Sequence, residues 1–373
     1  MLPLFERYPL LRDKLPYVPL GKFPTPLDKL DRLADDIGTD HLYIKRDDLS
    51  GEVYGGNKIR KLEFLIGHAL RTKAKEVVTF GFAGSNHALA TAVYAQQVGL
   101  KSISMLMPQP NAHYVRHNLL MSRCCGAELY QHRNTPLLAA GTIYQLLRHG
   151  LKHGRLPQII PAGGSSPLGA TGFVNAAFEL KEQIVKGEIP EPDRIYVVLG
   201  TMGTAAGLML GLGAANLTSQ VISVRVVEEK FANVRGMLKL IHKTNSFLHS
   251  LDPSFPELGF SEEDIDIRHD FVGQQYALFT EAGMEAVTRM EKTEGIRLDG
   301  TYTGKALAAL IDDVKKQDLR DKIVLFWNTY NSREFSDVIA AVDYHHLPRC
   351  FHRYFETEVQ PLDRHSYKMA CYT

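Results

Sequence analysis

A lysine directly behind a Gly-Gly turn is the first feature of this sequence that could do chemistry. It lies in VYGGNKIRKLEF, residues 53–64, where Lys58 follows Gly55, Gly56 and Asn57 and precedes a run typical of a helix. A lysine amine withdrawn from water among positive dipoles can lose its proton and attack a carbonyl, and glycines let the backbone approach a bulky ligand. The alternative is a solvated lysine in the basic run KIRK, of which one member could be structural.

A glycine-rich loop is the second feature. GTMGTAAG, from Gly200 to Gly207, follows the β-branched run IYVVL and opens a helical run. Free N–H groups at a helix N-terminus favour an anion. The loop lacks the GK[ST] of a P-loop and an acidic partner for a ribose, so a phosphate monoester is the expected guest. The alternative is a turn needed only for close packing of strand and helix.

Two further turns open helices and carry hydroxyl or amide side chains. GSNHALATAVYAQQVGL begins at Gly84, and Ser85 or Asn86 is a good N-cap for the alanine-rich run behind it. The same capped N-terminus could hold a carboxylate, with Asn86 free to bond a phenolic oxygen. The turn PAGGSSPLGATG offers Ser165 and Ser166. Asp47 and Asp48 are expected to cap or form salt bridges near the lysine loop.

Composition limits the function classes. Forty-three basic and forty-two acidic side chains leave a net charge of +1, so nucleic-acid and anionic-membrane partners are not expected. The uncharged stretch from Ile195 to Val224 contains glycines and polar residues, and it indicates a buried strand, turn and helix rather than a membrane span. Four cysteines without a CxxC pair, and an N-terminus unlike a signal peptide, favour a reduced, cytoplasmic protein.

Apolar, β-rich segments alternate with helical runs of about 10 to 15 residues, which is typical of βαβ units. The sequence therefore predicts an α/β protein with mostly parallel sheets. The expected strands lie in HLYIKRDD and at residues 76–82, 101–108, 158–164, 194–200, 221–227 and 322–328, and the clearest helical runs are HALATAVYAQQVG, ATGFVNAAFELKEQIVK and GKALAALIDDVKKQ. The polar stretch 231–267 is expected to carry surface helices.

Taken in order, these motifs resemble the fold-type II pyridoxal-phosphate enzymes, which are tryptophan synthase β-like, and more narrowly the D-cysteine desulfhydrase and 1-aminocyclopropane-1-carboxylate deaminase family. The resemblance covers most of the chain and rests on FPTPLDKLDRL, YIKRDDLSG, GGNKIRKLEFL, GSNHA, NLLMSRCCGAEL, PAGGSSPLGATGFV, GTMGTAAGL, YALFTEAG and LDGTYTGKA. It implies two open, twisted α/β domains with pyridoxal 5'-phosphate in the cleft between them. The expected division is a large domain of residues 1–61 plus 173–373 and a small domain of residues 62–172, with a C-terminal extension at about 343–373 of unknown role.

The resemblance also implies roles for individual residues. Lys58 would bind the cofactor covalently and later move the α-proton of the substrate, and the catalytic set would be Lys58, Ser85, Tyr276 and Tyr302. Core aromatic residues are the alternative for the two tyrosines. Substrate contacts would come from Ser85, Asn86, His87 and Ser165, and cofactor contacts from Asn57, Lys58, Asn86, Gly200, Thr201, Met202, Gly203, Thr204, Thr303 and Thr329.

Two positions indicate which substrate the chain uses. Family members that open the cyclopropane ring carry a glutamate after the tyrosine of TYTGKA, where this chain has Thr303, and Thr329 in FWNTYNS matches a threonine of the desulfhydrases. The expected activity is therefore α,β-elimination from D-cysteine or a relative, giving pyruvate, ammonia and sulfide. One departure leaves the substrate open: Asn328, Thr329, Tyr330 and Asn331 stand where the family usually reads His-Thr-Gly-Gly.

The alternatives are deamination of the cyclopropane amino acid, elimination from another β-substituted amino acid, and a pyridoxal-phosphate-binding protein with little turnover. A small amino acid is the expected partner, and the family implies a homodimer. No metal is expected, because His345, His346, Cys350 and His352 fit no standard zinc spacing.

Overall fold

The protein, described here by a computed structural model over residues 1–317 and 319–364, divides into two compact units. Unit 1 comprises Met1–Leu15, Gly21–Phe64 and Ser165–Ser332. Unit 2 comprises Pro16–Leu20, Leu65–Gly164 and the chain from Arg333 onward.

Unit 1 is built on a six-stranded sheet in the order β1-β2-β10-β7-β8-β9. All neighbouring strands are parallel except β1, which pairs antiparallel with β2. The strands are β1 (Leu27–Lys29), β2 (His41–Lys45), β7 (Arg194–Leu199), β8 (Gln220–Arg225), β9 (Asp266–Arg268) and β10 (Ile323–Trp327). Parallel strands need helical crossovers, which place helices on both faces of the sheet.

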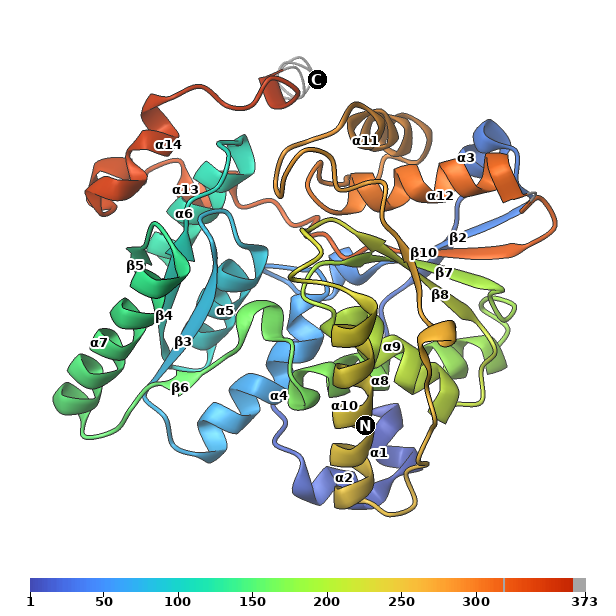
Figure 1. Ribbon diagram of the computed structural model, residues 1–373, viewed down its shortest axis with the longest axis horizontal. Coiled ribbons are helices and arrows are strands. Elements are labelled where there is room, and N and C mark those ends of the chain that lie inside the picture. Colours follow the sequence, from blue (N-terminus) through green and yellow to red (C-terminus); the bar gives the residue numbers. More distant parts are fainter. Residues whose placement is uncertain (318, 365–373) are drawn as a thin grey trace. The chain divides into compact units, whose positions relative to one another are not determined.

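The helices of unit 1 cover both faces of this sheet (Figure 1). On one face lie α3 (Asp31–Ile37), α11 (Glu281–Glu294) and α12 (Thr303–Gln317), and on the other lie α8 (Pro167–Val185), α9 (Gly203–Ala214) and α10 (Val234–Leu251). Short helices complete the unit: α1 (Pro3–Arg7), α2 (Pro9–Lys14), η1 (Asp47–Leu49) and η3 (Glu262–Asp264). Helix α4 (Lys58–Arg71) begins in unit 1 and continues into unit 2.

Small residues set the close approach of α8 and α9. A Cβ atom at Gly207 would lie 2.4 Å from the carbonyl oxygen of Ala170, and one at Gly211 would lie 2.7 Å from that of Val174. Both distances are too short for a larger residue, so these two glycines serve helix packing. The glycines at 200 and 203, before or at the start of α9, belong to the loop described below.

Unit 2 contains a four-stranded parallel sheet in the order β5-β4-β3-β6. Helix α7 packs on one side, where Leu138 and Leu146 contact the core residues Val78, Ile103 and Met105. The elements are β3 (Glu76–Phe82), β4 (Lys101–Met107), β5 (Glu128–Gln131), β6 (Gln158–Ile159), α5 (Asn86–Gln97), α6 (His113–Cys124), α7 (Thr135–His153) and η2 (Ala162–Gly164, at the junction with unit 1).

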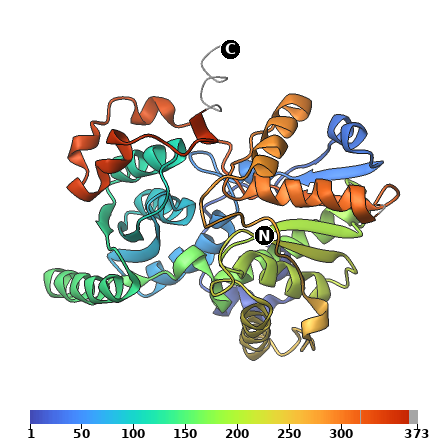
Figure 2. The same cartoon turned by 45° about the horizontal axis from the view of Figure 1, so that its top comes forward.

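The C-terminal segment belongs to unit 2 and lies beside α6, as both views show (Figures 1 and 2). It forms α13 (Ser336–Ile339), η4 (Tyr344–His346), η5 (Arg349–Phe351) and α14 (Arg353–Glu356). Asn111 and Arg116 donate side-chain hydrogen bonds of 2.9 Å and 2.7 Å to the carbonyl oxygen of Tyr354. These contacts join residues 333–364 to α6 and the loop before it, so the division of the chain differs from the expected one here. The other boundaries between the two units fall after residues 64 and 164, whereas the sequence predicted them after about residues 61 and 172.

The α/β architecture with mostly parallel sheets is confirmed, and each of the seven expected strands overlaps an observed one. The short strands β1, β5 and β9 were not expected, because segments of three or four residues carry little periodic signal. The uncharged stretch forms β7, α9 and β8, as predicted. Among the described residues, no helix is both long and apolar enough to cross a membrane.

Candidate active site

Lys58 is the first residue of α4, and the turn before it admits only glycine. A Cβ atom at Gly55 would lie 2.0 Å from the carbonyl oxygen of Asp48, and Gly56 has a φ of +94°, which disfavours other residues. The N–H of Gly55 donates to Oδ1 of Asn331 at 2.6 Å, and the N–H of Asn57 donates to the carbonyl oxygen of Thr329 at 3.2 Å. The loop that follows β10 therefore fixes the lysine turn.

Two side chains of the loop that departs from His-Thr-Gly-Gly make hydrogen bonds in this region. The side chain of Asn331, at a position where the family usually has glycine, accepts a hydrogen bond from the Gly-Gly turn. Asn328 is fully buried, and its Oδ1 atom accepts the N–H of Tyr330 at 3.2 Å. The altered loop thus supports the lysine turn through side chains.

Arg60 is the structural member of the basic run KIRK. It is 1% exposed and pairs with Oδ1 of Asp47 at 2.7 Å and with Oε2 of Glu179 at 2.8 Å. Lys45 joins Glu179 at 2.7 Å, and the indole N–H of Trp327 donates to Oδ2 of Asp47 at 2.8 Å. This buried network fixes the first turn of α4, and it confirms that Asp47 forms a salt bridge near the lysine loop. Asp48 does so as well, through Arg46.

The amine of Lys58 has a pKa suited to chemistry near neutral pH. Withdrawal from water lowers its pKa to about 8, and the negative charge of Asp299 partly opposes that change. Asp299 is buried and accepts the backbone N–H groups of Tyr302 at 3.1 Å and Thr303 at 2.9 Å. Burial raises the pKa of Asp299, while these hydrogen bonds favour its ionised form.

The loop after β7 gathers several residues singled out in the sequence. The hydroxyl of Ser165 donates to Oγ1 of Thr201 at 2.8 Å and accepts the N–H of Gly203 at 3.1 Å. The side-chain amide of Asn57 donates to Oγ1 of Thr204 at 2.9 Å. Met202 adopts a left-handed conformation with φ +68°, and its side chain does not cap α9. A Cβ atom at Gly200 would meet nothing within 4 Å, so the loop has open space beside it.

Lys61 is a residue that the sequence analysis did not single out. It is 1% exposed, and its Nζ atom lies 3.0 Å from the place where a Cβ atom of Gly203 would be. Burial and, second, the charge of Lys58 lower the pKa of Lys61 well below its usual value. The spacing of three between Lys58 and Lys61 places both on one side of a helix, and this is the signal that could have found it.

The geometry favours an anion at the start of α9. The amine of Lys61 lies beside Gly203, and the positive end of the helix dipole favours a negative charge there. The hydroxyls of Ser165, Thr201 and Thr204 add polar groups of the kind that bind phosphate oxygens. Close packing is needed at Gly207 and also at Gly203, where a Cβ atom would lie 2.6 Å from Oγ of Ser165, whereas Gly200 has open space beside it.

A third group surrounds Asp299. The hydroxyls of Tyr276 and Tyr302 hydrogen-bond to each other, and their rings meet edge to face at 6.1 Å. Burial raises the pKa of Tyr276 to about 12, and the bond from Tyr302 partly opposes this. Thr303 donates its hydroxyl proton to Oδ1 of Asp299 at 2.7 Å and accepts the N–H of Asp299 at 2.9 Å. The side chain of Thr303 therefore closes the turn that starts α12.

Ser85, Asn86 and His87 belong to unit 2, at the start of α5. Ser85 is the N-cap of α5, which was one of the two roles predicted for it. Its Oγ atom accepts the N–H of Ala88 at 3.2 Å. Oδ1 of Asn86 accepts the side-chain amide of Asn118 at 2.9 Å. His87 is buried in the first turn.

Comparisons with known proteins identify the family of this chain. The family model described as "Pyridoxal-phosphate dependent enzyme" matches residues 18–329. A D-cysteine desulfhydrase of Serratia proteamaculans is 33% identical over 83% of this chain and 91% of its own. A Pyrococcus horikoshii protein named after 1-aminocyclopropane-1-carboxylate deaminase is 34% identical over 83% of this chain and 90% of its own. The crystal structure of an ACC deaminase homologue covers 91% of this chain and 99% of its own, with 31% identity and a TM-score of 0.74.

The chain belongs to the family of pyridoxal-phosphate dependent enzymes, with the α/β fold of their fold-type II members. Within that family it groups with the 1-aminocyclopropane-1-carboxylate deaminases and D-cysteine desulfhydrases, so the recognition made from the sequence is confirmed. Pyridoxal phosphate is its cofactor, and the protein is a lyase or deaminase. The positive potential and hydroxyl groups at the start of α9 fit the phosphate of this cofactor.

The pKa of Lys58 makes cofactor capture dependent on pH. Because its pKa is lowered to about 8, the amine is mostly protonated below that value and mostly neutral above it. We expect the rate of covalent capture by the cofactor-free protein to rise about tenfold per pH unit below about pH 8 and then to level off. Stopped-flow absorbance at a series of pH values would measure this rate.

The matched control is Asp299→Asn. Removal of the negative charge that raises the pKa of Lys58 should shift the midpoint to lower pH. A midpoint near 10, as for a solvated lysine, or no shift in Asp299→Asn would contradict the assignment.

Proposed function

We propose that the protein catalyses α,β-elimination from D-cysteine, giving pyruvate, ammonia and sulfide. The observation that carries the proposal is the placement of Lys58, whose pKa of about 8 combines with a neighbouring loop suited to phosphate. The similar D-cysteine desulfhydrases support the choice of substrate. The uncharged Thr303 supports D-cysteine as the substrate further. Its hydroxyl both donates a hydrogen bond to Asp299 and accepts one from the N–H of Asp299, within the same turn.

When bound, pyridoxal phosphate supplies an electron sink for negative charge at the α-carbon of the amino acid. The amine of Lys58 is the proposed base that removes the α-proton, since its pKa leaves a useful fraction neutral at pH 7 to 8. A thiolate can then leave from the β-carbon, and hydrolysis of the remaining enamine gives the keto acid and ammonia. Overall, D-cysteine and water yield pyruvate, ammonia and hydrogen sulfide.

The other site residues bind and orient in this proposal. Tyr276 stays protonated because its pKa is raised to about 12, so the Tyr276–Tyr302 pair can donate a hydrogen bond on the substrate side. Ser85 and Asn86, with the N–H groups at the start of α5, would hold the substrate carboxylate, and His87 and Ser165 would complete the substrate set. Asn86 would also bond the phenolic oxygen of the cofactor, and Thr329 its ring nitrogen.

The cofactor phosphate would be held by residues 200–204 and by Lys61. Thr303 is proposed to act near the cofactor through Asp299 rather than by direct contact, because its hydroxyl is bonded to that carboxylate. Asn57 would position Thr204 through their 2.9 Å hydrogen bond.

Turnover of D-cysteine is the first test. The purified holoenzyme should release pyruvate, ammonia and sulfide in equal amounts from D-cysteine. Lys58→Ala should lose about 10²- to 10⁴-fold in rate, which is the range that a positioned base contributes. L-cysteine, β-chloro-D-alanine and the cyclopropane amino acid are the comparison substrates, and the exposed Lys75→Ala is the matched control.

Preferred turnover of the cyclopropane substrate would favour the deaminase alternative, and a bound cofactor with no turnover would favour a binding protein.

Loss of the buried amine of Lys61 should weaken cofactor binding. In Lys61→Gln we expect at least a tenfold rise in the cofactor dissociation constant, since charge-assisted hydrogen bonds to phosphate are strong. Equilibrium dialysis with absorbance readout would measure it. Because Lys58 remains, the bound cofactor should still be covalently attached; an unchanged dissociation constant would remove Lys61 from the phosphate site.

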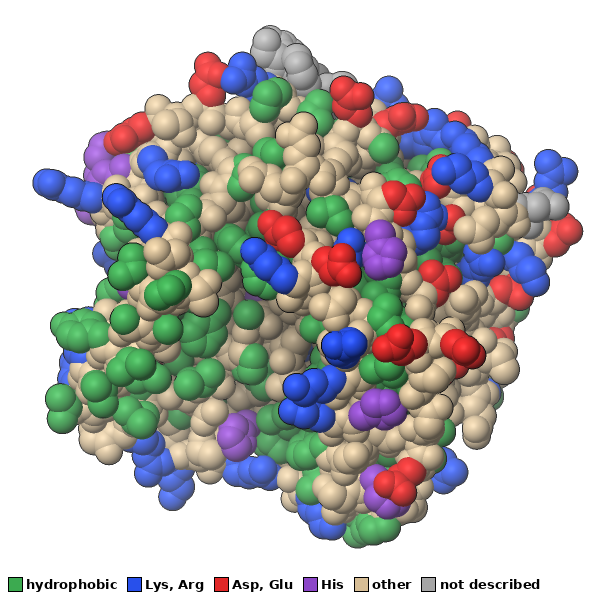
Figure 3. All heavy atoms as spheres, in the orientation of Figure 1, with side chains coloured by type: hydrophobic (Ala, Val, Ile, Leu, Met, Phe, Trp, Pro, Cys, Tyr) green, Lys and Arg blue, Asp and Glu red, His purple; other side chains and the backbone are tan. Residues whose placement is uncertain are grey.

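The homodimer implied by the family is proposed to use the outer face of α7. Leu137, Tyr144, Leu147 and Leu151 recur there at helical spacing and are 51%, 62%, 57% and 88% exposed. The space-filling view shows hydrophobic side chains gathered over α7 at the lower left (Figure 3). An exposed apolar patch of this kind marks an interaction surface, and a second copy of the chain is the proposed partner.

Charge on this face should separate the subunits. Leu147→Glu with Leu151→Glu is expected to convert a dimer to a monomer in sedimentation equilibrium. Val185→Glu, at a 76% exposed position at the end of α8, is the control that should leave the dimer intact. A monomeric wild type, or a dimer in the double variant, would contradict the proposal.

The cytoplasm is the proposed location. The described cysteines Cys124, Cys125 and Cys350 are all free thiols, which suits a reducing compartment. Cys371 lies outside the described residues. Localisation of a tagged chain would check this.

A further inference from the structure

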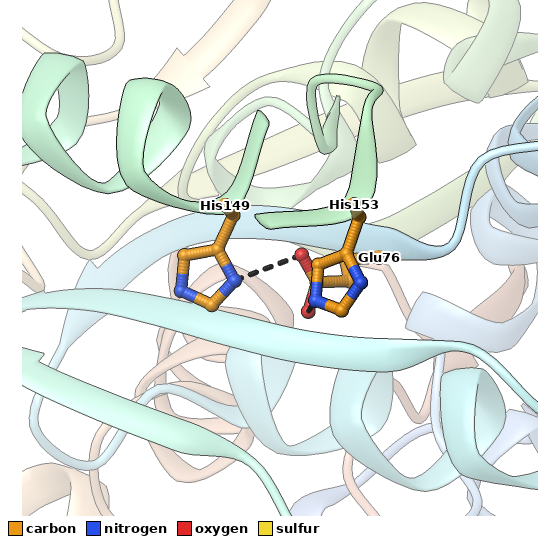
Figure 4. Close-up of side chains that lie close together, drawn as sticks. All are labelled: Glu76, His149 and His153. Atoms are coloured by element: carbon orange, nitrogen blue, oxygen red, sulfur yellow. Dashed lines mark hydrogen bonds and ion pairs between the residues drawn. The ribbon is translucent and has the colours of Figure 1, made fainter. Parts of the chain in front are cut away.

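A buried cluster of two histidines and a glutamate lies in unit 2, on the inner side of α7. His149 and His153 are four residues apart in the last turn of that helix, so they lie on the same side of it. Both imidazoles point toward the carboxylate of Glu76, the first residue of β3 (Figure 4). The side chains of His149, His153 and Glu76 are 1%, 25% and 3% exposed, so the cluster is largely closed to solvent.

The donor atoms are close enough to share one metal ion. One ligand atom from each residue lies within 4.8 Å of the others, and Nε2 of His153 is 3.4 Å from Oε1 of Glu76. Ligand atoms of a tetrahedral zinc ion at bond lengths of about 2.1 Å are about 3.4 Å apart. Nδ1 of His149 lies 2.8 Å from Oε2 of Glu76, so a small outward movement of this pair would open the required space.

Two imidazole nitrogens in the cluster lack hydrogen-bond partners. Nε2 of His149 and Nε2 of His153 are both buried, and neither makes a hydrogen bond within the described part of the chain. Buried polar atoms almost always have a partner, so each unpartnered nitrogen needs an explanation. A bound cation would account for Nε2 of His153 directly.

Glu128 on β5 accounts for the other nitrogen. Its Oε2 atom lies 3.4 Å from Nε2 of His149 and also accepts the hydroxyl of Tyr130 at 2.7 Å. A metal-bound histidine commonly gives its second ring N–H to a carboxylate, which fixes the ring and raises its basicity. With Nδ1 of His149 on the metal, Nε2 would donate to Glu128 in this way.

We propose that Glu76, His149 and His153 bind one divalent transition-metal ion, with zinc the best match, and that Glu128 orients His149. Two imidazoles and one carboxylate form a ligand set that zinc accepts, leaving a fourth position for water. The ion would join the last turn of α7 to the start of β3. Because all these residues lie in unit 2 and none is in the proposed catalytic set, this metal would take no part in the proposed elimination.

The sequence contains a signal for this site in its two histidines at helical spacing. The expectation of no metal considered the C-terminal histidines and Cys350 and not the His-x-x-x-His spacing in HGLKH. Within residues 1–317 and 319–364, the C-terminal set forms no group of three or more potential ligands, whereas Glu76, His149 and His153 do. Glu76 could not be assigned to this pair before the fold was known, because it lies 73 residues from His149.

The test is metal binding by the chelator-treated holoenzyme in a buffer free of thiols and of D-cysteine, which would compete for zinc. Isothermal titration with zinc should give one site per chain, and zinc should raise Tm because it binds only the folded state. Cobalt should give the visible absorption of a tetrahedral site.

His153→Gln is the decisive variant, because its partly exposed side chain can be replaced without unfolding the core. We expect it to weaken zinc binding at least tenfold and to abolish the rise in Tm, while the exposed His346→Gln binds zinc as the wild type does. Glu76→Gln, checked for folding by circular dichroism, should behave like His153→Gln. Substoichiometric binding, equal binding in His153→Gln, or equal loss in His346→Gln would overturn the proposal.

Discussion

The buried ion pairs of Arg60 with Asp47 and Glu179 are the constraint on which the proposed active site depends. Three charged side chains this far from water are tolerated only because each is paired and hydrogen-bonded. The pairs join η1, α4 and α8, and the indole of Trp327 adds the end of β10. They hold the first turn of α4 in one orientation, so Lys58, two residues earlier, has a fixed position.

The fixed first turn of α4 keeps the amines of Lys58 and Lys61 buried, and this burial lowers their pKa values. Arg60 is paired with two carboxylates, and Lys58 and Lys61 lie in the first turn of the same helix, where a positive charge is unfavourable. Burial lowers the pKa of both amines, and only Asp299 opposes this at Lys58. The same burial that suits Lys58 to its proposed role as a base also places the amine of Lys61 close to Gly203. One arrangement thus serves the proposed chemistry and the cofactor phosphate.

The longer strands and helices could be predicted from sequence because their periodicity and their glycine-rich ends are local signals. The three shortest strands could not, since their pairing depends on neighbours far along the chain. The assignment of the C-terminal segment differed for the same reason. Its aromatic residues carry no regular period, and its place in unit 2 depends on contacts such as those of Asn111 and Arg116 with Tyr354.

The sequence by itself determined the family and the cofactor and singled out Lys58 as the proposed cofactor lysine, because GGNKIRKLEF and GTMGTAAG are contiguous motifs whose chemistry is local. Only the tertiary structure decided the separate roles within KIRK. Arg60 faces Asp47 and Glu179, and Lys61 faces Gly203. Burial and charge pairing depend on which distant residues surround a side chain, and spacing within one segment does not contain that information.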